Sequence, residues 1–294
     1  MKIESQEISL PLLKEKDILL FVKRLDKSHP FISGNKWFKL KYNLIEAKKL
    51  GYDTFLTFGG AYSNHISAAA FAAKRKRLKS IGVIRGEERL PLNPTLVLAR
   101  ENGMELHYVS REDYRLKTAP KFLNKLKAQF GDFYLVPEGG TNELAIKGTS
   151  EILDKIDSQD YICCAVGTGG TIAGIINASN KKQKVIGFPA IQGFDILEKN
   201  IRNWTNKQNY KFIKNYFSGG YAKLNKELVE FINQFNSLHN IPLDAIYTGK
   251  MMLGIMELIK QDYFPKGSTI LAIHTGGLQG NKGMTERLGI KLPA

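Results

Sequence analysis

Five consecutive residues, Gly167-Thr168-Gly169-Gly170-Thr171, are of the types that bind a phosphate group. Glycines let the backbone turn tightly, so several N–H groups can point at one place. A helix that begins after such a turn adds partial positive charge there, and threonine hydroxyls add further donors. The run therefore predicts a phosphate-binding turn, although a plain strand-to-helix turn can have the same glycine content.

The flanking residues indicate which kind of phosphate to expect. A dinucleotide-binding turn would have glycine in place of Ile172 and an acidic residue about 20 positions later, but the strand expected at 184–189 has no acid. A Walker-type loop would need Ser or Thr after Gly249-Lys250, where this chain has Met251. The run therefore favours a single phosphate, as on a phosphorylated cofactor.

Short apolar runs alternate with helical patterns along most of the chain, beginning with the run at 161–166 that precedes the glycines. Strands are expected at 54–58, 80–85, 105–109, 133–136, 161–166, 184–189 and 269–273, and helices at 37–50, 66–76, 94–102, 120–130, 143–156, 172–178, 223–236 and 249–260. This order predicts an α/β fold with largely parallel sheets and flanking helices. Residues 201–216 show little periodicity, and we expect a surface excursion there.

Polar or glycine-rich turns follow four of these strands, around Ser63, Asn142, Thr168 and Thr275. Each alone could be only a helix cap, because Ser, Thr and Asn are favoured at caps. Functional groups in parallel sheets gather at the carboxyl ends of the strands. The four turns therefore predict one cleft, provided that the strands are neighbours.

Composition limits the classes of function. The chain has 294 residues, 43% of them hydrophobic, and a formal net charge of +15. The cluster at 74–77 ends an expected helix, where cations offset the helix dipole, and the other basic residues are scattered. We expect a solvated basic surface that attracts an anionic substrate, and no nucleic-acid partner.

The cysteines and the apolar runs indicate the compartment. Cys163 and Cys164 are neighbours on an expected strand, so they face opposite ways and are interpreted as buried thiols. Without a disulfide framework the chain fits a reducing cytoplasm. The start of the chain does not resemble a signal peptide, and the early apolar run at 18–22 is too short to cross a bilayer. We expect no membrane partner.

Assembled in order, these motifs resemble those of the pyridoxal-phosphate enzymes with the tryptophan-synthase-β fold. Within that group the chain is similar to the family of 1-aminocyclopropane-1-carboxylate deaminase and D-cysteine desulfhydrase. The matching motifs run in family order over almost the whole chain: Ser33-Gly-Asn-Lys36-Trp-Phe-Lys-Leu40, Thr57-Phe-Gly-Gly-Ala-Tyr-Ser-Asn-His65, Glu138-Gly-Gly-Thr-Asn142, Gly167-Thr-Gly-Gly-Thr171, Tyr247-Thr-Gly-Lys250 and His274-Thr-Gly-Gly277.

The resemblance implies the parts of the site that hold the cofactor. Lys36 would form the Schiff base with the cofactor aldehyde, and burial beside a helix start would lower its pKa. The residues Gly167, Thr168, Gly169, Gly170 and Thr171 would bind the 5′-phosphate. Asn64 would lie beside the ring oxygen, and Thr275 would face the pyridine nitrogen, which a hydroxyl leaves unprotonated.

The resemblance also implies the parts that handle the substrate. Ser63, Asn64 and His65 would lie under the substrate carboxylate, at the start of a helix whose N–H groups suit an anion. Tyr247 and Tyr221 would lie near the ring and relay protons, so the expected catalytic residues are these two tyrosines with Lys36 and Ser63. Thr248 would take part in binding the substrate.

The choice of reaction depends on Thr248 and Thr275. In the family, deaminases that open the cyclopropane ring have Glu and Leu at these positions, whereas the desulfhydrase branch has hydroxyl residues at both. We therefore predict α,β-elimination of a small amino acid, with D-cysteine giving pyruvate, hydrogen sulfide and ammonia. Ring opening of the cyclopropane acid to 2-oxobutanoate and ammonia is the alternative. A non-catalytic basic protein that binds a phosphate ligand or nucleic acid is the alternative from another class.

The resemblance implies a two-domain architecture. Residues 1–38 and 147–294 would form the larger, cofactor-binding domain, and residues 39–146 a smaller inserted α/β domain. The cofactor would lie in the cleft between them, where closure excludes water from the reaction. A homodimer is expected from the family alone.

Overall fold

The computed structural model describes residues 3–29, 32, 34–190, 194–215 and 223–293. Within these residues the strands form two sheets, which confirms the expected α/β architecture. The six-stranded sheet has the order β1-β2-β10-β7-β8-β9, with β1 (Ser5–Ile8), β2 (Leu19–Arg24), β7 (Tyr161–Val166), β8 (Lys184–Pro189), β9 (Tyr210–Phe212) and β10 (Thr269–His274). The four-stranded sheet has the order β5-β4-β3-β6, with β3 (Thr54–Gly60), β4 (Lys79–Arg85), β5 (Met104–Val109) and β6 (Tyr134–Val136).

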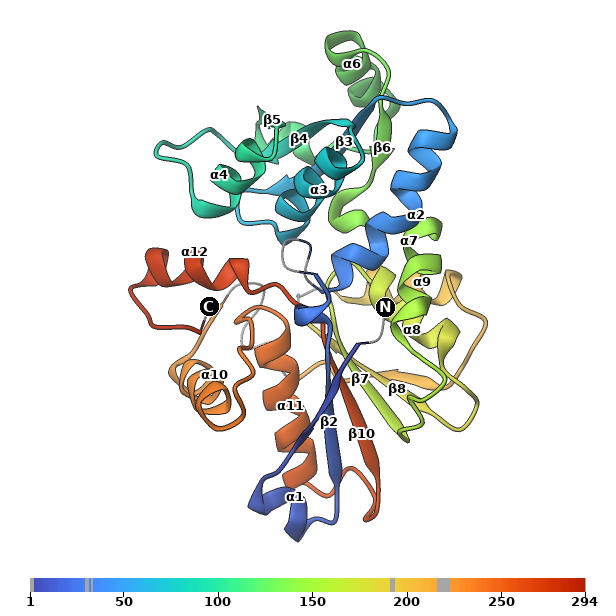
Figure 1. Cartoon of the computed structure of the whole chain (residues 1–294), viewed down its shortest axis with the longest axis vertical. Coiled ribbons are helices and arrows are strands. Elements are labelled where there is room, and N and C mark those ends of the chain that lie inside the picture. The colour runs from blue at the N-terminus through green and yellow to red at the C-terminus, as the bar shows by residue number, and fades with distance from the viewer. Residues whose placement is uncertain (1–2, 30–31, 33, 191–193, 216–222, 294) are drawn as a thin grey trace.

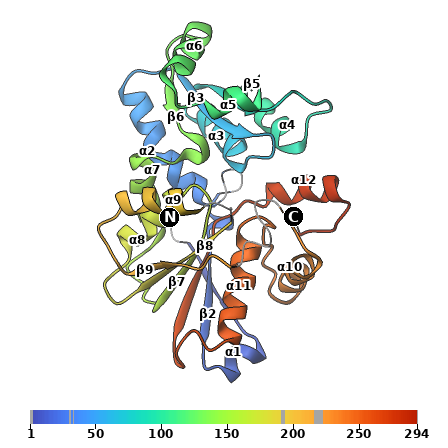
Figure 2. The ribbon, with the colours of Figure 1, turned by 180° about the vertical axis from the view of Figure 1, so that it is seen from behind.

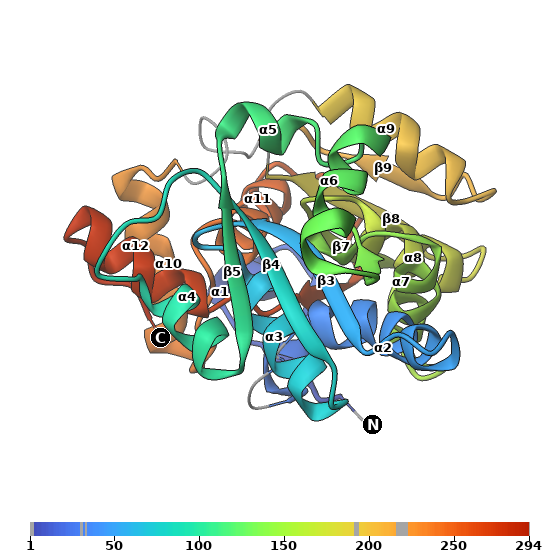
Figure 3. The same cartoon turned by 90° about the horizontal axis from the view of Figure 1, so that it is seen from above.

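All neighbouring strands are parallel except β1 and β2. Figure 1 shows the four-stranded sheet above the six-stranded one. Seen from above, α9 (Phe194–Asn203) and α12 (Gln279–Leu288) lie at opposite sides of the molecule (Figure 3). Parallel order within each sheet brings the polar turns after the strands to one edge of that sheet.

Helices connect and cover the strands. They are α1 (Pro11–Glu15), α2 (Asn35–Lys49), α3 (Asn64–Arg75), α4 (Pro94–Glu101), α5 (Arg111–Arg115), α6 (Pro120–Phe130), α7 (Glu143–Thr149), α8 (Gly170–Ala178), α10 (Lys226–His239) and α11 (Thr248–Lys260), besides α9 and α12, with short 3₁₀ turns at Leu25–Lys27, Glu138–Gly140 and Ser150–Ile152. Within the described residues, no helix is both long and apolar enough to cross a bilayer.

The two faces of the large sheet have separate cores. Cys163 packs with apolar residues of α10 and α11 on one face, and Cys164 packs with those of α8 on the other. The prediction that the two thiols are buried and face opposite ways is therefore confirmed. Both ribbon views show α11 and α8 on the two sides of this sheet (Figures 1 and 2).

The small sheet is also covered on both faces. Phe55 packs with the alanine-rich α3 and with α2, whereas Phe58 packs with Tyr114 of α5 and Leu126 of α6. Alternation along β3 therefore sends successive side chains into different cores.

Two expectations about elements were wrong. Residues 201–216 are not only a surface excursion, because Tyr210–Phe212 is the edge strand β9, paired with β8. Gly187 of β8 leaves room for the ring of Phe212, whose Cδ1 lies 2.5 Å from where a Cβ would stand. The helix expected at 143–156 ends at Thr149 and continues only as a 3₁₀ turn.

The sheets use different parts of the chain. Every strand of the small sheet lies between Thr54 and Val136, and every strand of the large sheet lies outside that range. Helix α2 runs across the expected boundary at residue 38, so the boundaries themselves stay a prediction.

Candidate active site

A cavity of about 830 Å³ lies where the carboxyl ends of strands from both sheets meet. It is lined by residues that follow β3, β7 and β10, together with residues of α2 and α12. Ten of the predicted site residues are among those that line it: Lys36, Ser63, Asn64, His65, Gly167, Thr168, Gly169, Thr171, Tyr247 and Thr275. All four predicted turns meet at this cavity, because Glu138 and Gly139 of the turn around Asn142 line it too. The strands before these turns are neighbours only in pairs, β3 with β6 and β7 with β10, in two different sheets.

The remaining predicted residues lie elsewhere. Gly170 and Thr248 are not among the residues that line the cavity, and Tyr221 lies outside the described residues. Asn142 is a helix cap: its Oδ1 accepts the N–H of Ala145 at 2.9 Å at the start of α7. Asn142 itself therefore acts as a cap, while Glu138 and Gly139 of the same turn line the cavity.

Lys36 is the second residue of α2, and the start of this helix is fixed against two other loops. The N–H of Asn35 donates to the carbonyl oxygen of Thr275 at 3.1 Å, and its side-chain Nδ2 donates to Thr171 Oγ1 at 2.7 Å. Burial lowers the pKa of Lys36 to about 8, an effect partly opposed by the negative charge of Asp244. The neutral, nucleophilic amine is therefore more populated near neutral pH than in an ordinary lysine, although the protonated form still predominates below the pKa.

The glycine turn has the form that its sequence predicts. Strand β7 ends at Val166, Gly169 is left-handed with φ of 85°, and α8 begins at Gly170. The helix starts two residues earlier than expected, so its first N–H groups belong to the turn itself. Donors at this helix start can hold an anion.

A second lysine, Lys39, lies beside the same turn. Its side chain is 2% exposed, and its Nζ donates to Gly139 O at 3.0 Å, Thr141 Oγ1 at 2.9 Å and Thr168 Oγ1 at 3.1 Å. Burial and then the charge of Lys36 hold the pKa of Lys39 well below its usual range. A phosphate dianion at the turn would favour the charged form of Lys39, so this lysine suits a phosphate counter-charge.

The turn between β3 and α3 presents Ser63, Asn64 and His65 to the cavity. Asn64 Nδ2 donates to Gly277 O at 3.3 Å, while its Oδ1 is buried without a partner among the described residues. An unpartnered buried acceptor beside a cavity is what a missing ligand leaves behind.

His65, which lines the cavity, has a neutral ring with one unpartnered nitrogen among the described residues. Thr57 Oγ1 donates its proton to Val136 O, so it must accept from His65 Nε2, 2.8 Å away. The Nδ1 atom is then a bare acceptor, buried without a partner among the described residues. Burial, with the charges of Lys36 and Lys39, holds the pKa of His65 well below its usual range. A neutral Nδ1 has no hydrogen to donate to a carboxylate, so the geometry does not support His65 as a donor to the substrate, and the contact of Ser63 and Asn64 with the carboxylate stays a prediction.

Asp244 fixes the start of α11 and with it Tyr247. Its Oδ1 accepts the N–H groups of Ile246 and Tyr247 at 3.0 and 2.8 Å, and its Oδ2 accepts the N–H and the hydroxyl of Thr248 at 2.8 and 2.6 Å. Thr248 is fully buried in this contact. The ring of Tyr247 lies 3.1 Å from where a Cβ on Gly167 would stand, so a side chain there would have to displace the ring by a few tenths of an ångström.

Comparison with known proteins decides what this site serves. A family model described as pyridoxal-phosphate dependent enzyme matches residues 3–276. This chain belongs to that family. It is therefore a pyridoxal-phosphate-dependent enzyme.

Two named relatives and one solved structure show what this pyridoxal-phosphate enzyme is similar to. The bifunctional D-cysteine desulfhydrase/1-aminocyclopropane-1-carboxylate deaminase of Arabidopsis thaliana, named as mitochondrial, is 33% identical over 293 residues, covering 89% of this chain and 73% of that protein. The D-cysteine desulfhydrase of Klebsiella pneumoniae is 26% identical, covering 88% and 86%. The crystal structure of an ACC deaminase homologue superposes with a TM-score of 0.85 at 27% identity, covering 98% of this chain and 93% of that one.

The residues around the cavity fit pyridoxal phosphate. The glycine turn with Lys39 can hold the phosphate, Lys36 offers an amine to the aldehyde, and Asn64 leaves an unpartnered oxygen. Glu138 is the only carboxylate among the described residues that line the cavity, and it is engaged by Tyr114 at 2.9 Å and Lys117 at 3.4 Å. Thr275, whose side chain carries a hydroxyl, is among the lining residues, and its contact with the ring nitrogen stays a prediction.

Sequence reasoning missed Lys39 and Asp244. Lys39 had a local signal, because it follows Lys36 by three positions and so shares a helix face with it. Asp244 precedes the expected helix at 249–260 by too many positions to be recognised as its cap. Only the folded loop brings its carboxylate back to the N–H groups of the first turn.

Proposed function

We propose that this enzyme catalyses the α,β-elimination of a small amino acid, most specifically D-cysteine and water to pyruvate, hydrogen sulfide and ammonia. The observation that carries the proposal is the pair of residues Lys36 and Thr275 in one cavity. Lys36 has a lowered pKa, and the only carboxylate among the described lining residues, Glu138, is already engaged by other side chains. Pyridoxal phosphate, when bound, supplies an aldehyde that joins amines and a ring that withdraws electrons from the substrate α-carbon. A ring without an acidic partner withdraws less strongly, which suits loss of a β-substituent.

The residues of the chain would divide the work. Lys36 Nζ, with its pKa of about 8, would take the proton from the substrate α-carbon. Ser63 and Asn64, at the start of α3, would bind the α-carboxylate with the first N–H groups of that helix. Tyr247, held by Asp244, would lie beside the reacting centre and return or relay protons.

The glycine turn and Lys39 would anchor the cofactor. The N–H groups from Gly167 to Thr171 and the hydroxyl of Thr168 would donate to the phosphate. Lys39, already 3.1 Å from Thr168 Oγ1, would add the positive charge. This anchoring would orient the aldehyde toward Lys36.

Ring opening of 1-aminocyclopropane-1-carboxylate, which with water gives 2-oxobutanoate and ammonia, is the second candidate. The Arabidopsis relative is named for both activities, and this name favours the second candidate. In the comparison of family branches, a threonine at position 248 favours elimination. Its hydroxyl donates a hydrogen bond to Asp244 and does not line the cavity.

Product analysis with purified enzyme tests the proposal. Pyruvate and sulfide from D-cysteine are measured against 2-oxobutanoate from the cyclopropane acid, with Lys36→Ala as the control for background chemistry. We expect a higher kcat/KM for D-cysteine. A higher kcat/KM for the cyclopropane acid would establish the second candidate. Turnover of neither substrate by cofactor-loaded enzyme would contradict both.

We also propose the two-domain division at 1–38 with 147–294 and 39–146, because the strands of the two sheets separate along the same lines. A homodimer is proposed on the resemblance alone, and light scattering of the purified enzyme tests it. The cytoplasmic location stays a prediction.

A further inference from the structure

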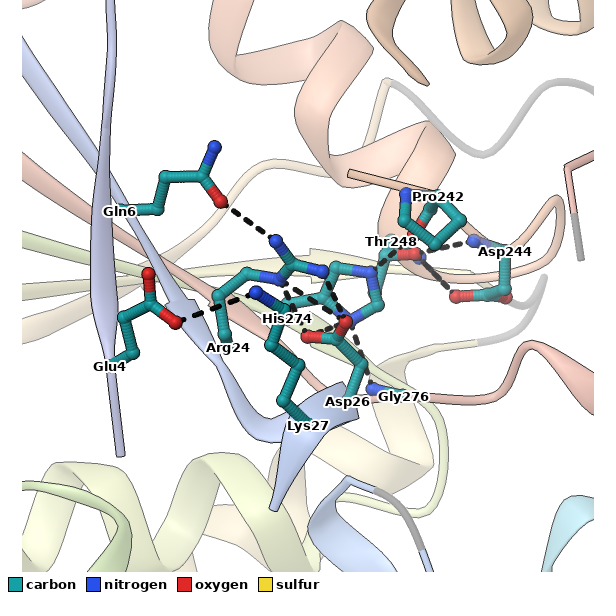
Figure 4. A network of polar contacts seen from close by, with 10 residues as sticks. All are labelled: Glu4, Gln6, Arg24, Asp26, Lys27, Pro242, Asp244, Thr248, His274 and Gly276. Atoms are coloured by element: carbon teal, nitrogen blue, oxygen red, sulfur yellow. Dashed lines mark hydrogen bonds and ion pairs between the residues drawn. The ribbon is translucent and has the colours of Figure 1, made fainter. Parts of the chain in front are cut away.

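His274, the last residue of β10, is held by hydrogen bonds on both ring nitrogens. Its Nε2 lies 2.6 Å from the carbonyl oxygen of Pro242, which can only accept. The N–H of Gly276 donates to its Nδ1 at 3.2 Å. The ring is therefore the neutral tautomer with the proton on Nε2, and it lies between Pro242 and Gly276 (Figure 4).

A buried ion pair supports this tautomer. Asp26 Oδ1 lies 3.5 Å from His274 Nδ1, and a carboxylate so close would normally favour a proton on that nitrogen. The carboxylate of Asp26 is instead paired with Arg24, whose Nε donates to Asp26 Oδ1 at 2.9 Å and whose Nη2 donates to Asp26 Oδ2 at 2.6 Å. The Nη1 of Arg24 donates to Gln6 at 2.7 Å, so the pair is fixed to β1 as well. Nδ1 is thereby left as an acceptor for Gly276.

The two contacts of the ring reach both sides of the candidate site. Pro242 begins the segment in which Asp244 caps α11 and fixes Tyr247. Gly276 belongs to the turn that begins at Thr275 and continues to Gly277, whose carbonyl oxygen accepts Asn64 Nδ2. Both glycines have positive φ, 77° and 96°. Because glycine can adopt many backbone conformations, contacts from outside the turn are needed to fix this one. His274 is 1% exposed and does not line the cavity.

We propose that His274 is a positioning residue, whose Nδ1 holds the Thr275–Gly277 turn in place while its Nε2–H ties that turn to the segment carrying Tyr247. Resting on the proposed function, this assigns to His274 the placement of the Thr275 hydroxyl and of Asn64 against the cofactor ring. The residue acts through Gly276 and does not touch the reacting atoms.

Two substitutions separate the two ring nitrogens. The side-chain oxygen of Asn occupies the place of His Nδ1, so His274→Asn keeps an acceptor for Gly276 and loses the contact with Pro242. The amide of Gln reaches the place of Nε2, so His274→Gln keeps a donor for Pro242 and loses the acceptor. Thermal unfolding of both variants provides the control for general loss of structure.

The first readout is hydrogen exchange at 275–277 in the cofactor-free protein, which needs no activity. We expect the Gly276 amide to stay protected in His274→Asn and to exchange about tenfold faster in His274→Gln, as the loss of one hydrogen bond implies. The second readout is the cofactor-loaded enzyme. There we expect His274→Gln to shift the cofactor absorbance band and to lower kcat about tenfold with little change in KM, and His274→Asn to retain both values.

The outcomes are distinguishable. Equal exchange in the two variants would overturn the tautomer and the proposal with it. Faster exchange in His274→Gln without any change in band or kcat would show that the turn has no part in placing the cofactor, which also overturns the proposal. Wild-type enzyme that binds cofactor without turning over D-cysteine or the cyclopropane acid would contradict the proposed function, while the exchange and the band would still test His274.

Discussion

The backbone N–H of Asn35 donates to the carbonyl oxygen of Thr275 at 3.1 Å, which joins the start of α2 to the end of β10. Lys36 and Thr275 are expected to act on opposite parts of the cofactor. One backbone hydrogen bond therefore joins Thr275 to the residue just before Lys36. The contact is close because Gly34 has no side chain: a Cβ there would lie 1.9 Å from the Thr275 oxygen. The start of the helix that carries Lys36 is therefore held by the turn after β10.

Replacing Gly34 tests this contact. Gly34 has φ of 77° and ψ of −154°, a region that residues other than glycine enter at a cost of about 1–3 kcal/mol. In Gly34→Ala we expect that strain plus the clash with Thr275, and hence a lower melting temperature and weaker cofactor binding. Gly51→Ala is the matched control, because Gly51 has φ of 79° and nothing within 4 Å of its Cβ position. Equal losses in the two variants would argue against the contact.

Lys39→Met tests the phosphate counter-charge. Loss of one charge-assisted hydrogen bond, worth about 1.5–3 kcal/mol, should raise the Kd for pyridoxal phosphate about 10- to 100-fold. The melting temperature of the cofactor-free protein should change little, because removing a buried cation offsets the lost hydrogen bonds. Lys41→Met, on the same helix but paired with Glu151 at the surface, is the control. Similar Kd values for the two variants would exclude the role of Lys39.

The pH dependence of cofactor uptake tests the state of Lys36. Its pKa is lowered to about 8, so the amine is protonated below that pH and neutral above it. The rate at which cofactor-free protein attaches pyridoxal phosphate should therefore rise with pH through about 8. Asp244→Asn removes the charge that raises this pKa, so its profile should shift to lower pH. Stopped-flow absorbance measures both profiles, and an unshifted profile would contradict the coupling.

Thr275 variants test how the ring nitrogen is treated. Thr275→Ser keeps the hydroxyl and should retain most D-cysteine elimination. Thr275→Leu removes it and should lower kcat about tenfold, the size of one lost hydrogen bond. Steady-state kinetics on D-cysteine checks both, with cofactor content measured in parallel. Full activity in Thr275→Leu would show that the Thr275 hydroxyl does not contribute to the reaction.

Local pattern was enough to predict seven of the ten strands among the described residues and the turns that line the cavity. The bounds of β7 agree with the apolar run at 161–166, and Ser63, Thr168 and Thr275 do meet at one cavity. These features depend on hydrophobic period and on where glycines stand, which are properties of neighbouring residues. Strand β9 escaped the same reasoning because its three residues owe their pairing to Gly187 in another strand.

Contacts between distant parts of the chain could not be predicted. Lys39 reaches a turn 129 positions away, and Asp244 acts on backbone groups that its own loop folds back to it. The direction of a side chain was equally hidden: Thr248 turns to Asp244 rather than into the cavity. Each depends on the geometry of a loop, about which residue types alone carry little information.

Chemical mapping of the attachment site identifies the lysine that forms the Schiff base with the cofactor. The cofactor-loaded enzyme is reduced with borohydride, digested, and its peptides are analysed by mass spectrometry. We expect the reduced cofactor to be attached to Lys36. We expect Lys36→Ala to have neither the modified peptide nor the violet absorbance of the Schiff base, with its fold intact. Attachment at Lys39, at Lys250 or at no lysine would contradict this expectation.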